Sequence, residues 1–439
     1  MARLTAACIV LLVLVLIAGC TVVKEEKTAA TASSSQKAAA GVELTLFTWT
    51  EAPEAEANQK LIDEFQQANP GLSVELQNQP GSKEAMAKLQ ALISGNQAPD
   101  VVSLHGAYYI PLASKGALLD IEPFIKKTPD FDLSDFDQRL VKLCRYRSKL
   151  YSLPRYTSVY ALFYNPDLFD SAGVKHPDQQ NPWDWDAYLK TAKQLTRDTN
   201  KDRKTETWGC VVDFWEARMY PWLWQNGADV FNQDRTRCLL DTPEAIEAVR
   251  FVRDLRYVHK VTPPTDTNER SQALDMFTQG NIAMYLTGPW DVQTLNEASE
   301  NQGLKWAVAP LPSRQRRATM LGTENYGICS QTKHPEEAWK LFAFLLSPHA
   351  QEYMAQTMEK MPSRTSVVQG AYVNAPVGYH RQVFADALSY AVEPPNIADW
   401  AQVRPLFQDE LDNIWVGTKT PEQGMKDAAR RINEYRAKQ

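Results

Sequence analysis

The chain of 439 residues lacks the short patterns that mark common enzyme classes. Its six histidines form no His-Glu-x-x-His array, and none stands beside a Cys-x-x-Cys pair, which excludes the zinc sites that these patterns build. A Gly-x-Ser-x-Gly elbow, a phosphate-binding loop and a dinucleotide fingerprint are also absent. The sequence therefore predicts no cofactor. The paired carboxylates of a glycosidase can still be hidden, since they are usually far apart in a chain.

One acidic segment imitates a calcium-binding loop. Asp198, Asn200 and Asp202 have the spacing of the first ligands of such a loop. Arg203, however, replaces the required glycine, and Gly209 stands where the bidentate glutamate belongs. We interpret this segment as a solvated turn and predict no metal site.

The chain also lacks an excess of basic charge. Its 47 lysines and arginines stand against 53 aspartates and glutamates, which gives a net charge of −6 with both signs mixed along the sequence. Nucleic-acid binding depends on a basic surface, so we expect no nucleic-acid partner. Aromatic residues are abundant, with 12 Trp and 17 Tyr, and their flat faces and polar edges suit both a core and a binding site.

Cysteine is scarce. Outside the first twenty residues only Cys144, Cys210, Cys238 and Cys329 remain, too few for a disulfide framework in so long a chain. Cys210 and Cys238 can pair if the protein is exported. Free buried thiols are the alternative.

Long apolar runs are missing except at the N-terminus. Residues 6–17 are apolar, follow Arg3 and are too few to cross a bilayer comfortably, which is typical of an export signal peptide at residues 1–19. The segment LIAGC at residues 16–20 resembles the lipobox of bacterial lipoproteins, which implies that Cys20 becomes the acylated first residue of the mature protein. The alternative is an ordinary cleaved signal that contains a cysteine.

Residues 20–40 are rich in Ala, Thr, Ser, Lys and Glu and contain no aromatic residue. Such a segment cannot bury enough apolar surface to fold, so it predicts a disordered tether. A lipid-anchored protein needs no spanning helix, because each buried methylene of an acyl chain contributes about 0.8 kcal/mol. The remaining part, roughly 400 residues, is long enough for two or three domain equivalents.

The first part of the folded region alternates strands and helices. Strands are predicted at residues 42–49, 72–77 and 99–104, and helices at residues 56–68 and 83–94. This β-α-β-α-β order predicts a parallel sheet with helices on its faces, a fold of the α/β class. Ligands of such sheets bind beyond the carboxyl ends of the strands, where Trp49 and residues 105–109 lie.

The rest of the chain mixes helices and strands without a fixed repeat. Helices are predicted at residues 183–196, 220–226, 243–259, 272–279, 335–346, 349–356, 404–416 and 421–437. Strands are predicted at residues 207–214, 282–286, 306–311 and 326–330. Extended segments around Pro154 and Pro166 indicate a passage into a second lobe.

Several short segments occur in an informative order. They are LTLFTW at residues 44–49, PDVVS at 99–103, GALLD at 116–120, YSLP at 151–154, FYNP at 163–166, FTQG at 277–280, AM at 283–284 and GPW at 288–290. Together they resemble the extracellular solute-binding proteins of bacterial ABC importers, in particular the sugar-binding family that includes the maltose-binding protein. The resemblance covers nearly the whole mature chain. Each segment alone is a weak signal, but their occurrence in this order after a lipobox is highly specific for the family.

The resemblance implies a two-lobe, periplasmic-binding-protein-like α/β fold. Hinge segments join the lobes, which close over a ligand in the cleft between them. The N-terminal lobe is expected at residues 41–154 and 289–325, and the C-terminal lobe at residues 155–288 and 326–439. The expected crossings lie near residues 155–156, 287–290 and 324–327.

Strand ends and the resemblance select the first candidate ligand contacts. Sugars present apolar faces and hydroxyl rims, which aromatic and planar polar side chains bind. Trp49 belongs either to the site or to the core, and one of Tyr108 and Tyr109 is expected to face the cleft. Arg155 and Tyr156 lie at the first crossing, where Arg155 either binds hydroxyls or pairs with an acid across the hinge.

The later segments supply further candidates. Trp290 matches a Gly-Pro-Trp position that often stacks on sugar in the family, with hinge packing as the alternative. Glu324 and Asn325 match a polar contact at the last crossing. Either Trp215 or Trp224 is expected to reach the ligand.

Two late residues complete the set. Arg364 either matches a family position near the cleft or forms a structural salt bridge. Trp400 is similar to a late aromatic platform of the family.

The resemblance implies an exported lipoprotein that captures a sugar or oligosaccharide by lobe closure and delivers it to the permease of an ABC importer. We expect a monomer that is anchored to a membrane by lipid and faces outside the cytoplasm. Two alternatives stay open, namely the same fold with a polyamine, phosphodiester or osmolyte as ligand, and an exported glycosidase.

Overall fold

The computed structural model describes residues 41–106, 109–178, 181–198, 202, 204–264, 270–375, 379–395 and 397–439. The predicted signal peptide, the predicted acylation site Cys20 and the predicted tether lie outside the described residues, as do Tyr108, Asn200 and Arg203. Within the described residues, no helix has the length and apolar character that a bilayer crossing requires.

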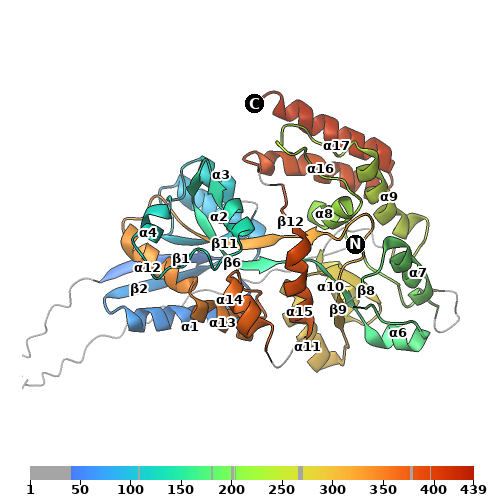
Figure 1. Ribbon diagram of the computed structural model, residues 1–439, viewed down its shortest axis with the longest axis horizontal. Helices are drawn as coiled ribbons and strands as arrows, with labels where there is room; N and C mark the ends of the chain where they lie inside the picture. The colour runs from blue at the N-terminus through green and yellow to red at the C-terminus, as the bar shows by residue number, and fades with distance from the viewer. Residues whose placement is uncertain are drawn as a thin grey trace, which may run out of the picture. The chain divides into compact units, whose positions relative to one another are not determined.

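The first lobe is built on a five-stranded sheet in the order β2-β1-β3-β11-β6 (Figure 1). Its strands are β1 (Val42–Thr48), β2 (Leu72–Asn78), β3 (Val101–His105), β6 (Ser152–Ser158) and β11 (Gly322–Ile328). The first three are parallel, while β11 runs antiparallel to both β3 and β6. The predicted β-α-β-α-β order is confirmed, with helices α1 (Ala52–Ala68) and α2 (Ser82–Ser94) between the strands.

Both faces of this sheet are covered because its strands carry apolar side chains on each side. On one face α1 packs through Leu61, Ile62 and Phe65, together with helices α12 (Pro335–Leu345) and α13 (Pro348–Met358). On the other face lie α2 and the short helix α3 (Tyr109–Ser114). The short elements at the rim are α4 (Glu122–Lys126), α5 (Gln138–Leu143), β4 (Arg145–Tyr146) and β5 (Lys149–Leu150).

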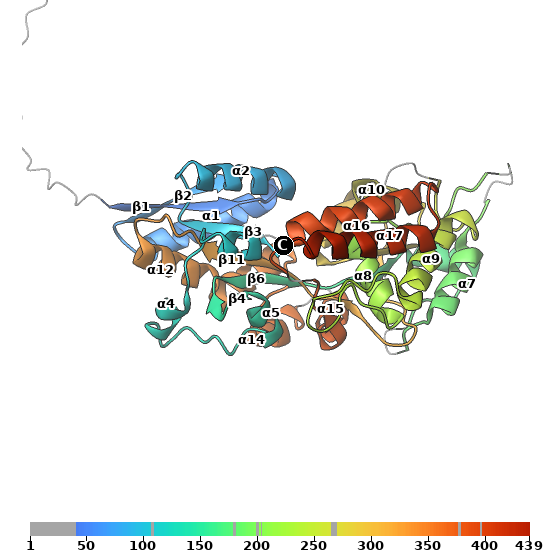
Figure 2. The same cartoon turned by 90° about the horizontal axis from the view of Figure 1, so that it is seen from above.

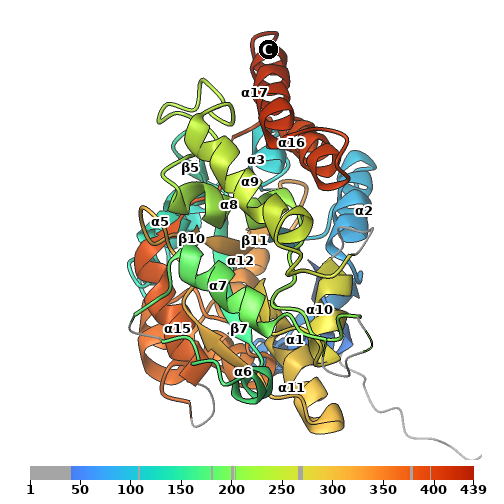
Figure 3. The ribbon, with the colours of Figure 1, turned by 90° about the vertical axis from the view of Figure 1, so that its right-hand side faces the viewer.

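The second lobe contains a three-stranded sheet in the order β8-β7-β9. Its strands are β7 (Ala161–Tyr164), β8 (Met284–Thr287) and β9 (Ala307–Ala309). The larger of its cores is formed by α7 (Trp185–Leu195), α8 (Glu216–Gln225), α9 (Pro243–Tyr257), α16 (Trp400–Trp415) and α17 (Pro421–Arg436). Figures 2 and 3 show α16 and α17 side by side next to α8 and α9.

Further helices surround this sheet. They are α6 (Pro166–Ala172), α10 (Arg270–Thr278), α11 (Val292–Gln302), α14 (Thr365–Val367), α15 (Tyr379–Ala387), the 3-10 turns η1 (Pro289–Asp291) and η3 (Leu388–Tyr390) and a π-helix, η2 (Val368–Tyr372). A pair of two-residue strands, β10 (Thr319–Met320) and β12 (Ala391–Val392), completes the described elements.

Several expected element boundaries are wrong, among them those of α1 and β11, which begin at Ala52 and Gly322, four residues before the predicted starts. Residues 207–214 form only isolated bridges, because at Gly209 the backbone runs so close to α7 that a Cβ would lie 2.0 Å from the Ala192 carbonyl oxygen. Helices α8 and α16 begin at Glu216 and Trp400, four residues before the predicted starts. Each contains a proline, a residue typical of a helix start, at its sixth position (Pro221 and Pro405), but the residues before it are also helical and pack in the core of the second lobe.

The assignment of later segments to the lobes also differs from the expectation. Residues 289–325 were expected in the first lobe, yet β9 pairs with β7 and α11 packs on the second sheet. Residues 326–439 were expected in the second lobe, yet most of β11 falls there and pairs with β3 and β6, while α12 and α13 cover the first sheet. Strands that pair in a sheet can lie far apart in the sequence, so the order of elements alone does not predict which strands pair.

The chain therefore crosses between the lobes at residues 159–160, at Leu321 and at residues 359–364. All three crossings meet at the buried Thr157. Its amide donates to the carbonyl oxygen of Met361 (3.0 Å), and its hydroxyl donates to the carbonyl oxygen of Gly322 (3.2 Å).

All four cysteines of the described chain are buried and free. Of the two alternatives for Cys210 and Cys238, the structure has the free thiols. Burial raises the pKa of each to about 12, which makes them inert at neutral pH.

Candidate functional site

A row of polar and aromatic side chains follows one edge of the first sheet. In the strand register Glu324 stands opposite both His105 and Tyr156, and directly opposed residues point to the same face. Trp49 directly follows β1, and its ring centroid lies 6.1 Å from that of His105. We call Trp49, His105, Glu324 and Tyr156 the first-lobe row. It lies at the carboxyl ends of β1 and β3, where α/β sheets bind ligands.

Arg155 supports this row from within the protein. It is 1% exposed, its guanidinium group pairs with Glu54, and it donates a hydrogen bond to Ser103 Oγ (3.1 Å). It also stacks on the ring of Tyr156 at 4.3 Å and lies 3.9 Å from a carboxylate oxygen of Glu324. Of the two roles predicted for Arg155, these contacts match pairing with an acid.

Lys360, from the third crossing, completes a charge network beneath the row. Its ammonium group lies 2.7 Å from Glu54 Oε2 and 5.5 Å from the ring centroid of Tyr156. Burial alone would raise the pKa of Glu54, but Lys360 and Arg155 hold it below its usual value. Glu324 has the opposite balance, because burial raises its pKa more than Lys360 and Arg155 lower it.

The second lobe presents a compact group at the start of α8. Trp215 occupies the N-cap position of this helix, and the Arg404 guanidinium lies 5.6 Å from the centroid of the Trp215 ring. Arg404 Nε is 2.5 Å from Glu216 Oε1, and Gln408, one turn later on α16, accepts a hydrogen bond from the Glu216 amide (2.9 Å). We call Trp215, Glu216 and Arg404 the second-lobe group.

An electrostatic interaction joins the row to the group. The pKa of His105 is lowered to about 4, first by burial and then by the positive charge of Arg404. His105 belongs to β3 of the first lobe and Arg404 to α16 of the second. We take the first-lobe row and the second-lobe group together as the candidate site, with one set of side chains from each lobe.

Trp290 lies partly buried beside the first crossing. Its ring meets that of Tyr160 edge-on, with centroids 5.2 Å apart. Gly288 is required beneath it, because a Cβ there would lie 2.4 Å from Trp290 Cη2 and 2.7 Å from the Val159 carbonyl oxygen. These contacts agree with hinge packing, while stacking on a ligand stays a prediction.

The other predicted contacts are enclosed by protein. Tyr109, Trp224 and Trp400 lie in the cores of their lobes, where Trp224 Nε1 donates to Asp229 (3.1 Å). Asn325 is fully buried, and its side-chain oxygen Oδ1 accepts a hydrogen bond from the Thr323 hydroxyl (2.7 Å).

Arg364 is likewise held inside the protein. Its guanidinium pairs with Asp135 (3.1 Å) and donates to the carbonyl oxygens of Leu346 (2.6 Å) and Asp132 (3.2 Å). This geometry matches the structural salt bridge that was its alternative role.

Several residues of the candidate site were missed. They are Glu54, His105, Glu216, Lys360 and Arg404. His105 ends a predicted strand at the ligand edge, so its position was a usable signal. Lys360 and Arg404 reach the site from segments far along the chain, and no local pattern marks them.

A separate cavity of about 500 Å³ lies beside the crossings. It is lined by α5, the third crossing, η2 and α15, and none of the predicted ligand contacts lines it. Arg139 there pairs with Asp137 (2.6 Å) and donates to the Leu388 carbonyl oxygen (2.8 Å), so its charge is already used within the protein.

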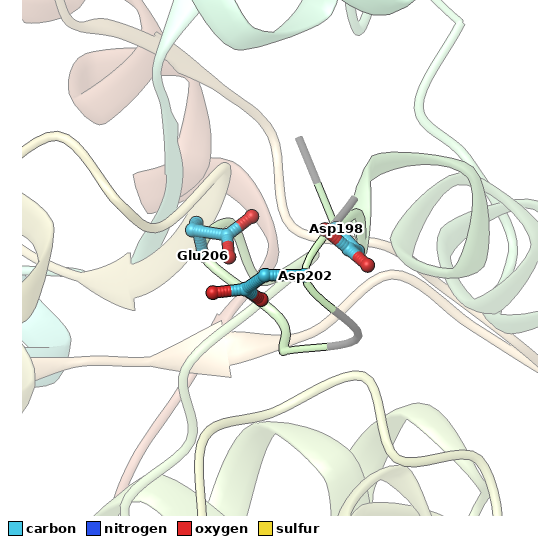
Figure 4. Close-up of side chains that lie close together, drawn as sticks. All are labelled: Asp198, Asp202 and Glu206. Carbon is cyan, nitrogen blue, oxygen red and sulfur yellow. The ribbon is translucent and has the colours of Figure 1, made fainter. Parts of the chain in front are cut away.

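The acidic segment is exposed. Carboxylate oxygens of Asp198, Asp202 and Glu206 lie within 4.8 Å of one another (Figure 4). Asp198 and Asp202 are exposed and Glu206 is only partly buried. Exposed acidic groups often lie this close without a metal, so the solvated turn stays our interpretation.

Comparison with known proteins finds similar sequences and structures among binding proteins. The arabinooligosaccharide-binding protein of Halalkalibacterium halodurans is 24% identical over 362 residues, which cover 78% of either chain. The maltodextrin-binding protein of Bacillus subtilis is 25% identical over 365 residues, 80% of this chain and 82% of that protein. An ABC substrate-binding protein from Listeria monocytogenes, solved in complex with cycloalternan, superposes with a TM-score of 0.81 at 27% identity and covers 90% of this chain and 99% of its own.

A family model spans most of the folded region. Residues 49–352 match the bacterial extracellular solute-binding proteins, which confirms the resemblance and the two-lobe fold. The chain belongs to the family of bacterial extracellular solute-binding proteins.

Proposed function

We propose that this protein captures a saccharide between its two lobes and delivers it to the permease of an ABC importer. The observation that carries the proposal is the combination of aromatic and planar polar side chains in the first-lobe row and in the second-lobe group. Trp49 and Trp215 offer flat apolar surfaces for sugar C–H faces, and Glu324 and Arg404 offer planar polar groups for hydroxyls. The names of the compared proteins, which bind arabinooligosaccharide, maltodextrin and cycloalternan, support a saccharide as the ligand class.

The charges at the candidate site favour an uncharged ligand. Its carboxylates are those of Glu54, Glu216 and Glu324, and its cations are those of Arg155, Lys360 and Arg404. Each carboxylate lies within 4 Å of one of these cations, and His105 is neutral at physiological pH. A polyamine would need an excess of acids and a phosphodiester an excess of bases, whereas a neutral polyhydroxylated ligand needs neither.

Capture by lobe closure follows from the way the lobes are joined. The three crossings meet at Thr157, so a rotation about this point changes the distance between row and group. In this proposal the protein binds its ligand without chemical turnover. The permease recognises the closed form of the protein.

We further propose that Cys20 carries the lipid anchor and keeps the protein at the membrane surface, outside the cytoplasm. The segment LIAGC supports acylation. The protein acts in this proposal as a monomer.

A thermal-shift screen of the mature protein tests the ligand class. Maltotriose, mannotriose and arabino-oligosaccharides are compared with spermidine and glycerophosphodiesters. A ligand at 100 times its Kd stabilises the folded state by about 2.7 kcal/mol, which is readily measured. A response to spermidine and to no saccharide would refute the sugar assignment, and catalytic release of reducing sugar would refute binding without turnover.

A further inference from the structure

Helices α5 and α15 lie on the side of the crossings that is turned away from the candidate site. Figures 2 and 3 show α5 and α15 on one side of β11, and α2 and α16 on the other side. Trp49 of the first-lobe row packs beside residues of α2, and Arg404 of the second-lobe group belongs to α16. The candidate site and the pair α5 and α15 are therefore separated by the strand that begins at the second crossing.

Arg139, on α5, connects the two lobes with its side chain. Its Nη2 donates to the Leu388 carbonyl oxygen (2.8 Å), and its Nη1 donates to the Ala391 carbonyl oxygen (3.2 Å). Asp137 binds the other side of the guanidinium, at 3.1 Å from Nε and 2.6 Å from Nη2. The planar guanidinium is thus held in one orientation toward the two carbonyl groups. We call Arg139 and these two carbonyl groups the interlobe clamp.

The interlobe clamp joins elements that belong to different lobes. Val141 of α5 is buried in the core of the first lobe. Leu388 directly follows α15, whose Phe384 packs on Phe163 of the second sheet with ring centroids 5.9 Å apart. Leu140 of α5 lies in the same apolar cluster as Phe384, so the contact between the lobes also has an apolar part.

Lobe closure has to break the polar part of this contact. The cavity of about 500 Å³ extends from the clamp to Thr157, where the three crossings meet. A rotation about this point that brings the first-lobe row closer to the second-lobe group moves α5 away from α15, because the two pairs lie on opposite sides. Apolar contacts are non-directional and tolerate sliding, whereas hydrogen bonds weaken steeply when their geometry changes.

We propose that the interlobe clamp opposes lobe closure and thereby lowers the affinity of the protein for its ligand. This inference rests on the proposed function. A ligand that binds the closed arrangement meets fewer competent molecules while the clamp is intact, so its apparent Kd is higher than that of an unclamped protein. Asp137 acts as a positioning residue that orients the guanidinium of Arg139.

A purely structural role for Arg139 makes a different prediction. If Arg139 only stabilises α5, its removal lowers the melting temperature and leaves the affinity unchanged. Asp137→Asn separates the two roles, because Asp137 also accepts a hydrogen bond from the Arg139 amide at the start of α5 (2.9 Å). Asparagine is an equally good N-cap residue, so the helix is kept while the guanidinium loses its charged partner.

Isothermal titration calorimetry of the mature protein with maltotriose, mannotriose and arabinotriose tests the inference. We expect Arg139→Met to lower the Kd of the bound probe by at least about threefold and Asp137→Asn to lower it by a smaller factor. The melting temperature of each variant, measured without ligand, shows whether its fold is kept.

Arg145→Met is the matched control for these variants. Arg145 lies in the same lobe, and its side chain is 33% exposed against 37% for Arg139. It also has an ion pair and a carbonyl partner, but Glu122 (2.8 Å) and Ser148 (3.3 Å) both belong to its own lobe. The Kd of this control should equal that of the wild type.

The distance between the lobes gives an independent reading without ligand. Pulsed electron paramagnetic resonance measures it between spin labels at Lys88→Cys on α2 and Lys426→Cys on α17, two exposed positions. The cysteines of the described chain are buried, and Cys20→Ala removes the remaining thiol of the mature protein. Arg139→Met should increase the population with the shorter distance, and the matched control should not.

The outcomes distinguish the two levels of the proposal. An unchanged or higher Kd in Arg139→Met overturns the inference and leaves saccharide capture intact. A fall of the Kd that is as large in Arg145→Met also overturns it, because the effect is then not specific to the clamp. If the wild type binds none of the probes, saccharide capture is refuted, and an unchanged distance in Arg139→Met refutes the clamp separately.

Discussion

Replacing Arg155 by methionine should destabilise the protein strongly. The guanidinium is 1% exposed and lies near two carboxylates, Glu54 and Glu324. Without it, Lys360 alone must balance both acids beneath the first-lobe row. Breaking a buried ion pair by removal of one partner costs about 3–5 kcal/mol, because the remaining charge stays buried. For a protein of this size that corresponds to a fall in Tm of roughly 5 °C.

The pH dependence of this loss identifies its cause. In the folded wild type the pKa of Glu54 is below its usual value of 4.5, so the carboxylate contributes stability above that pH and loses it as the pH falls toward the folded-state pKa. The Arg155→Met variant should lack most of this contribution. The difference in unfolding free energy between variant and wild type should therefore be large at pH 7 and should shrink as the pH falls below about 4.5.

Urea unfolding of the mature protein between roughly pH 3 and pH 8 measures this difference. Arg145→Met is the matched control. Arg145 forms an ion pair with Glu122 at 2.8 Å, and the Arg145 side chain is 33% exposed. Such surface pairs contribute about 0–1 kcal/mol. If Arg155→Met loses less than the control, or loses the same amount at every pH, the charge network does not have the role described here.

Three further predictions concern other parts of the chain. Gly288→Ala should lower the unfolding free energy by about 1–3 kcal/mol in calorimetry, because the new Cβ would meet Trp290 and the Val159 carbonyl oxygen; an unchanged Tm would contradict the close packing. The free energy of unfolding should fall by up to about 3 kcal/mol as the pH is lowered from 6.5 to 4, because His105 binds a proton in the unfolded state but not in the folded state. In the His105→Gln variant the free energy of unfolding should depend less on pH in this range. Cys20→Ala should move the protein from the membrane fraction to the soluble fraction while calorimetric binding of maltotriose stays the same, and continued sedimentation with membranes would argue against a lipid anchor.

The sequence was sufficient where structure depends on neighbours in the chain. The apolar alternation of β1 and the helical spacing of Leu61 and Phe65 each produce an element at the predicted place, because burial of one face follows directly from the pattern. The prediction of the solute-binding family is confirmed by the family match over residues 49–352. It was possible because the short segments that carry the resemblance occur along the chain in a fixed order.

The lobe assignment of residues 289–439 could not be predicted in this way. β9 joins a sheet with β7, and β11 joins the other sheet between β3 and β6. β9 has three residues and β11 has seven, and the partners of both depend on contacts with segments more than a hundred residues away. The helical pattern of α12 and α13 is equally compatible with either lobe.

The candidate site shows the same limit at the level of single side chains. The register brings His105, Glu324 and Tyr156 into one row, but a register across three non-consecutive strands cannot be read from the chain. Buried aromatic residues such as Trp224 fit a binding platform and a core equally well by composition. Only packing separates the two, and Trp224 is fully buried.

The third crossing connects the hinge to the site through two adjacent residues of opposite charge. Glu359 pairs with Arg381 of α15 in the second lobe (2.8 Å), and Lys360 pairs with Glu54 of α1 in the first lobe (2.7 Å). Glu359 has φ of 54°, a conformation that non-glycine residues rarely adopt, and both ion pairs help to hold it. Because Lys360 also lowers the pKa of Glu324 in the first-lobe row, the ionisation of this carboxyl depends on a backbone segment that joins the two lobes.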